Sequence, residues 1–253
     1  MNREELAKQT MHQLDMHQSD FDIAFPEFGT VKSRFVYGEV WAHSELSIKQ
    51  RLLVSIAALV TVQGEELLGM LHAALRNEVT PEELQEVFHQ AAPYIGFAKA
   101  EKGLHVLKKA FDEAGVKLPL GKQSTVTEET RLESGISAQK ALFGPVIDLM
   151  RANAPEDQRF MQDYLSAFCF GDTYTRGALD LKTRELLTFV CIISLGGCDS
   201  QAKAHVGGNL MAGNGKTVLV SAAAQCLPYI GFPRTLNALA AISEMTKPKE
   251  EAK

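Results

Sequence analysis

Two long apolar runs stand out in the pattern of hydrophobic and polar positions along the chain. They cover residues 48–62 and 181–195, contain neither Pro nor Gly, and are longer than ordinary β-strands. Apolar side chains fall on nearly all sides of each run, which indicates helices buried at the centre of a fold. Ser47 and Asp180 stand directly before the runs, where a side-chain oxygen can cap the free N–H groups of a first helical turn.

Further segments with helical signals follow each run. Gly64 and Gly197 fit a helix end at which the chain turns with positive φ. Thr80, Pro81 and Glu83 form the capping sequence of a later helix, with Pro at its first position. No segment shows a convincing strand pattern, so the sequence predicts an all-α fold. The other predicted helices cover residues 30–43, 65–76, 98–114, 156–170, 198–211 and 234–245.

The chain also repeats itself. Residues 93–97, Pro-Tyr-Ile-Gly-Phe, recur identically at 228–232, and further identities precede both blocks in the same order, His72 matching His205 among them. An identical five-residue block with ordered identities is not explained by chance matches between common helix formers. We therefore expect two copies of one helical unit, residues 1–115 and 128–253, joined by a linker that contains Gly and Pro at 116–127.

Composition and charge exclude several classes of protein. The net charge is −5 at pH 7, and Lys and Arg do not cluster in a basic stripe, so we expect no nucleic-acid partner. No apolar stretch reaches the roughly 20 residues of a membrane span, and the first ten residues lack the apolar core of a signal peptide. Four cysteines in 253 residues do not form a disulfide scaffold. We expect reduced thiols and a cytoplasmic protein.

One thiol has a distinctive position. Cys198, Gln201 and His205 are spaced at i, i+3 and i+7, which places them on one face of a helix. Cys198 follows two glycines, and the free N–H groups of a helix N-terminus stabilise a thiolate. His205 could then carry a proton, directly or through Gln201. The equivalent places in the first copy hold Glu65, Leu68 and His72, so any chemistry there would be acid–base chemistry.

The ordered motifs resemble those of the carboxymuconolactone decarboxylase and alkylhydroperoxidase D superfamily. Each copy has Leu-x-x-Lys-x-Arg, an apolar helix, a Gly turn, a helix with a His, and Pro-Tyr-Ile-Gly-Phe, over residues 35–111 and 168–245. The resemblance implies a duplicated alkylhydroperoxidase D-like helical bundle. It also implies a ring of subunits, which for a chain with two domains would be a homotrimer. Activity does not follow from the fold alone.

The first chemistry that the resemblance implies is acid–base decarboxylation, or a related lactone reaction, on a small organic acid. His205 or His72 would donate the proton, and Arg184 or Arg51 would hold the substrate carboxylate. Tyr229, beside the Gly turn, is a further candidate for substrate contact, with packing as the alternative. No metal or organic cofactor is expected, because no Cys/His spacing fits a zinc site and no Gly-rich phosphate loop is present.

The second chemistry is thiol-dependent peroxide reduction of the peroxiredoxin type. Cys198 matches the first cysteine of the Cys-x-x-Cys pair in the peroxidase branch, but Gln201 stands in place of the second. Glu185 resembles the glutamate that assists the pair. Either Cys191 or Cys226, or an external thiol reductant, would have to restore an oxidised Cys198.

Non-catalytic interpretations also remain open. A buried cysteine commonly packs as a small hydrophobe, the two histidines can be structural, and the two arginines can tie helices together. A third hypothesis is therefore an oligomeric protein that binds a small acid without converting it.

Overall fold

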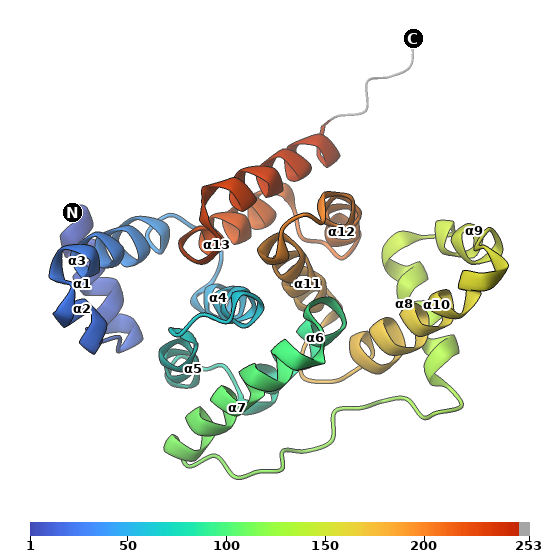
Figure 1. Cartoon of the computed structure of the whole chain (residues 1–253), viewed down its shortest axis with the longest axis horizontal. Helices are drawn as coiled ribbons and strands as arrows, with labels where there is room; N and C mark the ends of the chain where they lie inside the picture. The colour runs from blue at the N-terminus through green and yellow to red at the C-terminus, as the bar shows by residue number, and fades with distance from the viewer. Residues whose placement is uncertain (248–253) are drawn as a thin grey trace.

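The computed structural model describes residues 1–247, which form helices and turns without a β-strand (Figure 1). This confirms the all-α prediction. In chain order the elements are α1 (Arg3–Leu14), α2 (Asp20–Ala24), α3 (Pro26–Phe35), η1 (Val36–Val40), α4 (Ile48–Val62), α5 (Leu67–Arg76), α6 (Pro81–Ile95), α7 (Phe97–Glu113), α8 (Arg131–Phe143), α9 (Val146–Ala152), η2 (Glu156–Gln158), α10 (Arg159–Tyr164), η3 (Leu165–Tyr174), α11 (Leu181–Leu195), α12 (Asp199–Met211) and α13 (Lys216–Met245).

The predicted N-caps form. The Ser47 and Thr80 hydroxyls accept hydrogen bonds from backbone N–H groups in the first turns of α4 and α6, and the Asp180 carboxylate does the same for α11. Pro81 occupies the first turn of α6, where its missing N–H costs no helical hydrogen bond. Local sequence therefore fixes where these helices begin.

The end of α4 differs from the prediction. The left-handed residue is Gln63, with φ of 58°, while Gly64 has no positive φ. Gly64 is required for space instead, because a Cβ there would collide with the side chain of Leu59. In the second copy Gly197 has the predicted positive φ, 70°, but α11 already ends one residue earlier, at Gly196 with φ of 72°.

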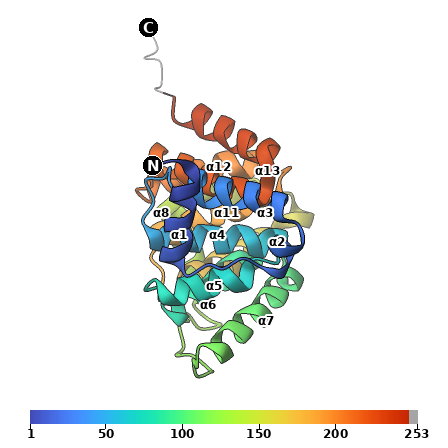
Figure 2. The ribbon, with the colours of Figure 1, turned by 90° about the vertical axis from the view of Figure 1, so that its left-hand side faces the viewer.

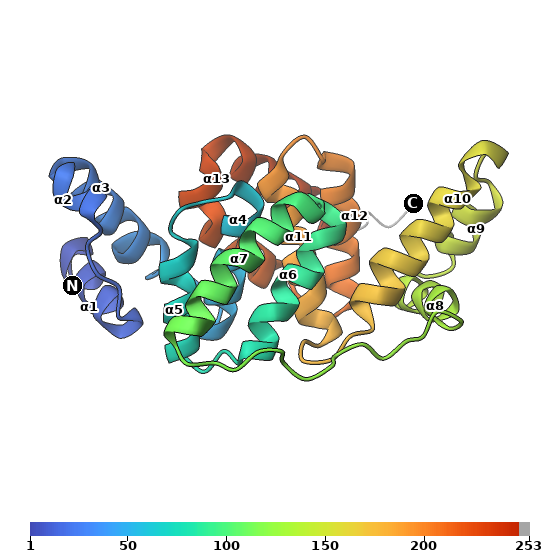
Figure 3. The same ribbon diagram turned by 60° about the horizontal axis from the view of Figure 1, so that its bottom comes forward.

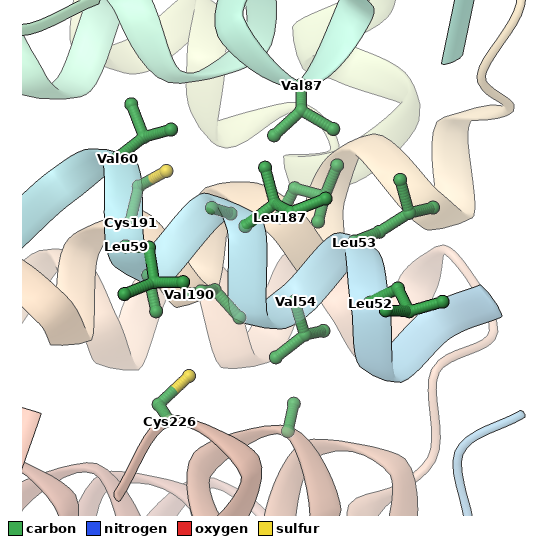
Figure 4. Close-up of a cluster of buried hydrophobic side chains, with 14 of the residues drawn as sticks. Leu52, Leu53, Val54, Leu59, Val60, Val87, Leu187, Val190, Cys191 and Cys226 are labelled. Atoms are coloured by element: carbon green, nitrogen blue, oxygen red, sulfur yellow. The ribbon is translucent and has the colours of Figure 1, made fainter. Parts of the chain in front are cut away.

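The two repeats share one core, and its centre is the pair α4 and α11 (Figure 4). Each central helix is also covered by a helix of the other repeat, because α6 packs on α11 and α13 packs on α4. Two matching hydrogen bonds mark this exchange: Gln90 Nε2 donates to Thr188 Oγ1 at 2.9 Å, and Gln225 Nε2 donates to Ser55 Oγ at 3.1 Å. A site next to α11 can therefore contain side chains from both repeats.

The duplication extends to α1 and α8, two helices that the hydrophobic pattern did not identify. Arg3 of α1 pairs with Glu39, and Arg131 of α8 pairs with Asp172. In both places the helix backbone passes so close to a π-helical segment that only glycine fits; these glycines are Gly38 and Gly171. Figures 1 and 3 show α1–α3 at one end of the molecule and α8–α10 at the other.

Two predicted helices are interrupted. The segment 30–43 consists of α3 followed by the π-helical η1, and the segment 156–170 contains η2, α10 and part of the π-helical η3. Insertions of this kind shift the face on which later side chains lie, and they are frequent at functional sites. Residues 116–127 form no helix and connect α7 to α8 along the outside (Figure 3). The domain boundaries placed there stay a prediction. No helix within residues 1–247 is both long and apolar enough to cross a membrane.

Candidate active site at His205 and Glu185

A buried carboxylate and imidazole form the centre of the candidate site. Glu185 lies in α11 and is fully buried, and its Oε1 is 2.7 Å from Nδ1 of His205 in α12. Asn209 fixes the two helices, since its Nδ2 donates to the backbone carbonyls of Glu185 and His205. Gly208 leaves room for the carboxylate, because a Cβ there would overlap Glu185 Oε1. The sequence thus provides both the pair and the space that it needs.

Four further groups extend this pair into a chain of hydrogen bonds. The Tyr174 hydroxyl donates to Glu185 Oε2 at 2.7 Å and lies 2.7 Å from Thr188 Oγ1. The Tyr94 hydroxyl is 3.1 Å from the Tyr174 hydroxyl, and Cys169 Sγ donates to Tyr94 at 3.3 Å. Both Glu185 oxygens therefore have a protein partner, Oε1 at His205 and Oε2 at Tyr174.

Burial determines the protonation of this chain. It raises the pKa of the Cys169 thiol to about 12, and it raises the pKa of the Tyr94 and Tyr174 hydroxyls well above their ordinary value. At neutral pH these three groups are therefore hydrogen-bond donors and not anions. Cys169 in this environment is a protonated thiol rather than a nucleophile.

Aromatic rings enclose the imidazole. Phe143 of α8 meets the His205 ring edge to face, with centroids 5.4 Å apart, and Tyr94 does so at 5.7 Å. His205 Nε2 has no hydrogen bond within residues 1–247, and the His205 side chain is 11% exposed. Nε2 is therefore the atom that can exchange a proton with a bound molecule. Because Tyr94 comes from α6, the site is formed where the two repeats meet.

Arg184, predicted to hold a substrate carboxylate, lies beside this network and not at its open edge. It is fully buried, and its guanidinium binds Glu86 at 2.8 Å, Gln90 at 3.1 Å and the carbonyls of nearby loop residues. Arg176 also binds Glu86. Arg51 makes the equivalent contacts to carbonyls at the start of α4. Arg184 therefore ties α11 to α6, and Arg51 ties the first turn of α4 to the segment 41–46 that precedes it.

The structure does not bring Cys198, Gln201 and His205 together. Cys198 stands at the N-cap of α12, where its Sγ is 3.5 Å from the Gly196 carbonyl oxygen, and it lines a small cavity with Arg234. Gln201 is exposed and bonds to Ser200, whereas His205 points to Glu185. No hydrogen bond joins the three within the part of the chain that the structure describes.

The other two candidate resolving thiols are in the central core. Cys191 and Cys226 are fully buried between α11, α4 and α13 (Figure 4), and all four cysteines are free. Burial raises the pKa of both thiols, that of Cys191 to about 12. Neither lines the cavity next to Cys198.

Most residues of the Glu185 hydrogen-bond network have no counterpart in the first repeat. Leu52 stands where the second repeat has Glu185, and Trp41 where it has Tyr174. His72 lies 2.9 Å from Glu113 of α7, and Tyr229, the counterpart of Tyr94, has a buried hydroxyl next to the repeat-1 helices. The hydrogen-bonded pair of His205 and Glu185 is therefore specific to repeat 2, because repeat 1 has Leu52 at the position of Glu185.

Sequence reasoning missed Tyr94, Tyr174, Cys169 and Phe143. One signal was available: a charged residue inside the apolar run 181–195 must find buried partners, and such partners are polar or aromatic. Within residues 1–247, no group of three or more His, Cys, Asp or Glu side chains is placed to hold a metal ion.

Comparisons with known proteins agree with the duplication. The sequence model of the carboxymuconolactone decarboxylase family matches the chain twice, at residues 26–109 and 161–244. The 4-carboxymuconolactone decarboxylase of Acinetobacter baylyi is 34% identical over 99 residues, which are 39% of this chain and 72% of that protein. A crystal structure from Burkholderia xenovorans, provisionally described as a gamma-carboxymuconolactone decarboxylase subunit, covers 97% of this chain and 98% of its own. Its TM-score is 0.58 and its identity is 18%, which shows a shared fold.

Proposed function

The chain belongs to the carboxymuconolactone decarboxylase family, and from this membership we propose that it is an enzyme for decarboxylation, or a related lactone reaction, of a small organic acid. The observation that supports the proposal best is the buried pair of His205 and Glu185, with Nε2 of the imidazole free to reach a bound molecule. A carboxylate on Nδ1 fixes the tautomer and stabilises the imidazolium form.

The proposed reaction needs one proton at one place. The bond between the substrate carbon and its carboxylate breaks, CO2 leaves, and the electron pair delocalises into the neighbouring unsaturated system. His205 then delivers the Nε2 proton to that carbon, and Glu185 stabilises the imidazolium before the transfer. Arg184 does not hold the anionic substrate in this proposal, because protein groups occupy its donors. Tyr174 keeps the carboxylate oriented.

The thiol-dependent peroxidase hypothesis has less support. It needs Cys198 and His205 to act together, whereas Cys198 contacts the Gly196 carbonyl and His205 contacts Glu185. Gln201 cannot resolve an oxidised thiol. We therefore do not advance this chemistry.

We also propose that the working form is a homo-oligomer, with a homotrimer as the first expectation. Both ends of the molecule carry exposed apolar side chains. On α2–α3 these include Phe21, Phe25 and Phe28, and on α9–α10 they include Leu149 and Phe160, each more than half exposed. Exposed apolar side chains that gather in one place commonly mark a surface that binds another protein chain.

The test is CO2 release from 4-carboxymuconolactone, the compound that names the Acinetobacter baylyi relative, by the wild-type chain and two histidine variants. His205→Asn should lose at least about 100-fold in kcat, because general acid catalysis contributes on that order. His72→Asn is the matched control and should retain turnover. A His205→Asn enzyme with full turnover would exclude this site. If no substrate of the class reacts even with wild type, the proposed function is wrong.

A further inference from the structure

A cavity of about 630 Å³ lies in repeat 1, between α1–α3, η1, α5 and the bend in α13. Figure 2 looks onto the three N-terminal helices that form its outer wall. The cavity occupies the place in repeat 1 where repeat 2 has the surroundings of Cys169 and Tyr94: Val36 and Tyr229, their counterparts in the repeat, line it. The volume is in the range of small-molecule sites.

Two tyrosine side chains line this cavity. Tyr37 is 9% exposed, and its hydroxyl has no hydrogen bond within residues 1–247. The Tyr229 hydroxyl is buried, and Ser55 is its hydrogen-bond partner within the protein, in poor geometry.

The charges at the cavity leave a negative excess. Its basic side chains are already paired, since Arg34 and Lys8 bind Glu4 and Lys32 binds Asp22. The two other acids that line it are Glu65 and Glu66, and neither has an ion pair within the described residues 1–247. Arg34 and Lys8 share the single carboxylate of Glu4, so the charged side chains that line the cavity sum to one negative charge with His17 neutral. The carboxylates of Glu65 and Glu66 are the acidic groups left for a ligand.

The remaining wall is apolar and polarisable. It includes Met11, Met16 and Leu68, together with the rings of Tyr37 and Tyr229. Aromatic faces and carboxylates in one pocket are the combination that binds an organic cation, because the ring quadrupole and the anion attract it while apolar side chains cover its carbon body. We propose that this cavity binds a compact monovalent organic cation, a primary or quaternary amine.

This binding site is independent of the reaction proposed at His205. Repeat 1 has Val36 and Leu52 where repeat 2 has Cys169 and Glu185, so its cavity lacks the buried carboxylate of the acid–base pair. It retains the enclosing helices and one of the two tyrosines. In this proposal repeat 2 carries the catalytic site and repeat 1 carries the cation-binding site.

The experiment is isothermal titration of the full chain with benzyltrimethylammonium, and with phenylacetate and benzyl alcohol as anionic and neutral probes of comparable size. We expect saturable binding of the cation alone. Glu66→Gln should weaken it about five- to tenfold, the size of one carboxylate–cation contact near a surface. Tyr37→Phe keeps the ring and should weaken it less. Glu101→Gln, at an exposed position of α7 that does not line the cavity, changes the net charge equally and should leave the affinity unchanged.

A filling variant makes the location of the site testable. A Cβ added at Gly69 would meet only Met16, at ordinary contact distances of 3.5 Å and 3.9 Å, so Gly69→Leu should fold and project into the cavity. It should abolish cation binding and leave the melting temperature of the free chain near that of wild type. The proposal is wrong if the cation does not bind at millimolar concentration. It is also wrong if the phenylacetate anion binds as well as the cation, or if Glu66→Gln and Gly69→Leu bind with wild-type affinity.

Discussion

The hydroxyl oxygens of Tyr94 and Tyr174 lie 3.1 Å apart, and through this contact repeat 1 reaches the carboxylate of Glu185 in repeat 2. Tyr94 belongs to α6 and Tyr174 to the end of η3, two segments that are far apart in the sequence. The contact exists because α6 packs on α11 of the other repeat as well as on α4 of its own repeat. Duplication has therefore produced an intramolecular interface, and the candidate active site is located in it.

Tyr174→Phe should impair both stability and turnover. The change removes the donor to Glu185 Oε2 and leaves a buried carboxylate oxygen without its partner. A hydrogen bond to a charged group is worth about 2 kcal/mol, so we expect a loss of that order in the free energy of unfolding. We also expect at least about a tenfold loss in kcat, because the carboxylate that holds His205 becomes mobile. Urea unfolding and the CO2 assay measure the two effects.

Tyr164→Phe is the matched control for this prediction. Tyr164 is 63% exposed and makes no hydrogen bond within residues 1–247, so removal of its hydroxyl should change neither quantity. Equal behaviour of the two variants would show that the bond to Glu185 has no role.

Gly208→Ala should inactivate the enzyme although Ala is the better helix former. The new methyl group would overlap Glu185 Oε1 and contact the Phe143 ring, so the carboxylate must leave Nδ1 of His205. Gly207→Ala provides an adjacent control. A Cβ there meets only Met245 at 3.9 Å, and the substitution should stabilise α12 by up to about 1 kcal/mol. Comparison of kcat for the two neighbours measures the requirement for the pair. An active Gly208→Ala enzyme would contradict it.

The sequence predicted the architecture well and the site only in part. Long apolar runs, caps and an identical block at 93–97 and 228–232 are local or repeated features, so helices and duplication can be inferred from one chain. His205 was named from its spacing to Cys198 and its match to His72, and Glu185 was named from the family resemblance. Their direct contact depends on how α12 crosses α11, which no periodicity encodes.

One misplaced expectation and one omission both arise where the backbone is irregular. Cys198 was placed on one helical face with His205, but its φ of −117° and ψ of 42° put it outside the helix, where a spacing of i and i+7 has no meaning. Tyr174 and Cys169 lie in the π-helical segment η3, in which a period of 3.6 residues assigns the wrong face. The irregular backbone next to the site is therefore the reason that the hydrophobic pattern did not identify these residues.

Alkaline pH should destabilise the fold through buried thiols such as Cys191. Burial raises the pKa of Cys191 to about 12 from an ordinary value near 9.0, so the folded protein keeps a proton that the unfolded chain loses. The stabilisation is complete below pH 9 and falls as the pH rises from 9 to 12. For one such group the loss at pH 10 is about 1 kcal/mol.

Cys191→Ala should therefore flatten the dependence of the unfolding free energy on pH between 9 and 11. Val190→Ala also removes buried atoms from the same helix but no titrating group. It should therefore lower the free energy of unfolding by the same amount at all pH values. Urea unfolding at a series of pH values distinguishes a change in slope from a change in level. Equal slopes for Cys191→Ala and wild type would mean that the thiol is not protected in the folded state.

Charges placed in the exposed apolar ends should dissociate the proposed homotrimer. Phe28 of α3 is 61% exposed and Phe160 of α10 is 52% exposed. Figure 1 shows these two helices at opposite ends of the molecule. A closed ring needs two different surfaces that meet between neighbours, so Phe28→Asp and Phe160→Asp should each reduce the mass measured by light scattering to that of one chain. If only one of them does, the ends do not pair with each other and the interface is isologous. His205 and its partners come from a single chain, so the dissociated variants should keep the His205–Glu185 pair. Turnover by these monomers therefore tests whether a neighbouring chain is needed to complete the site.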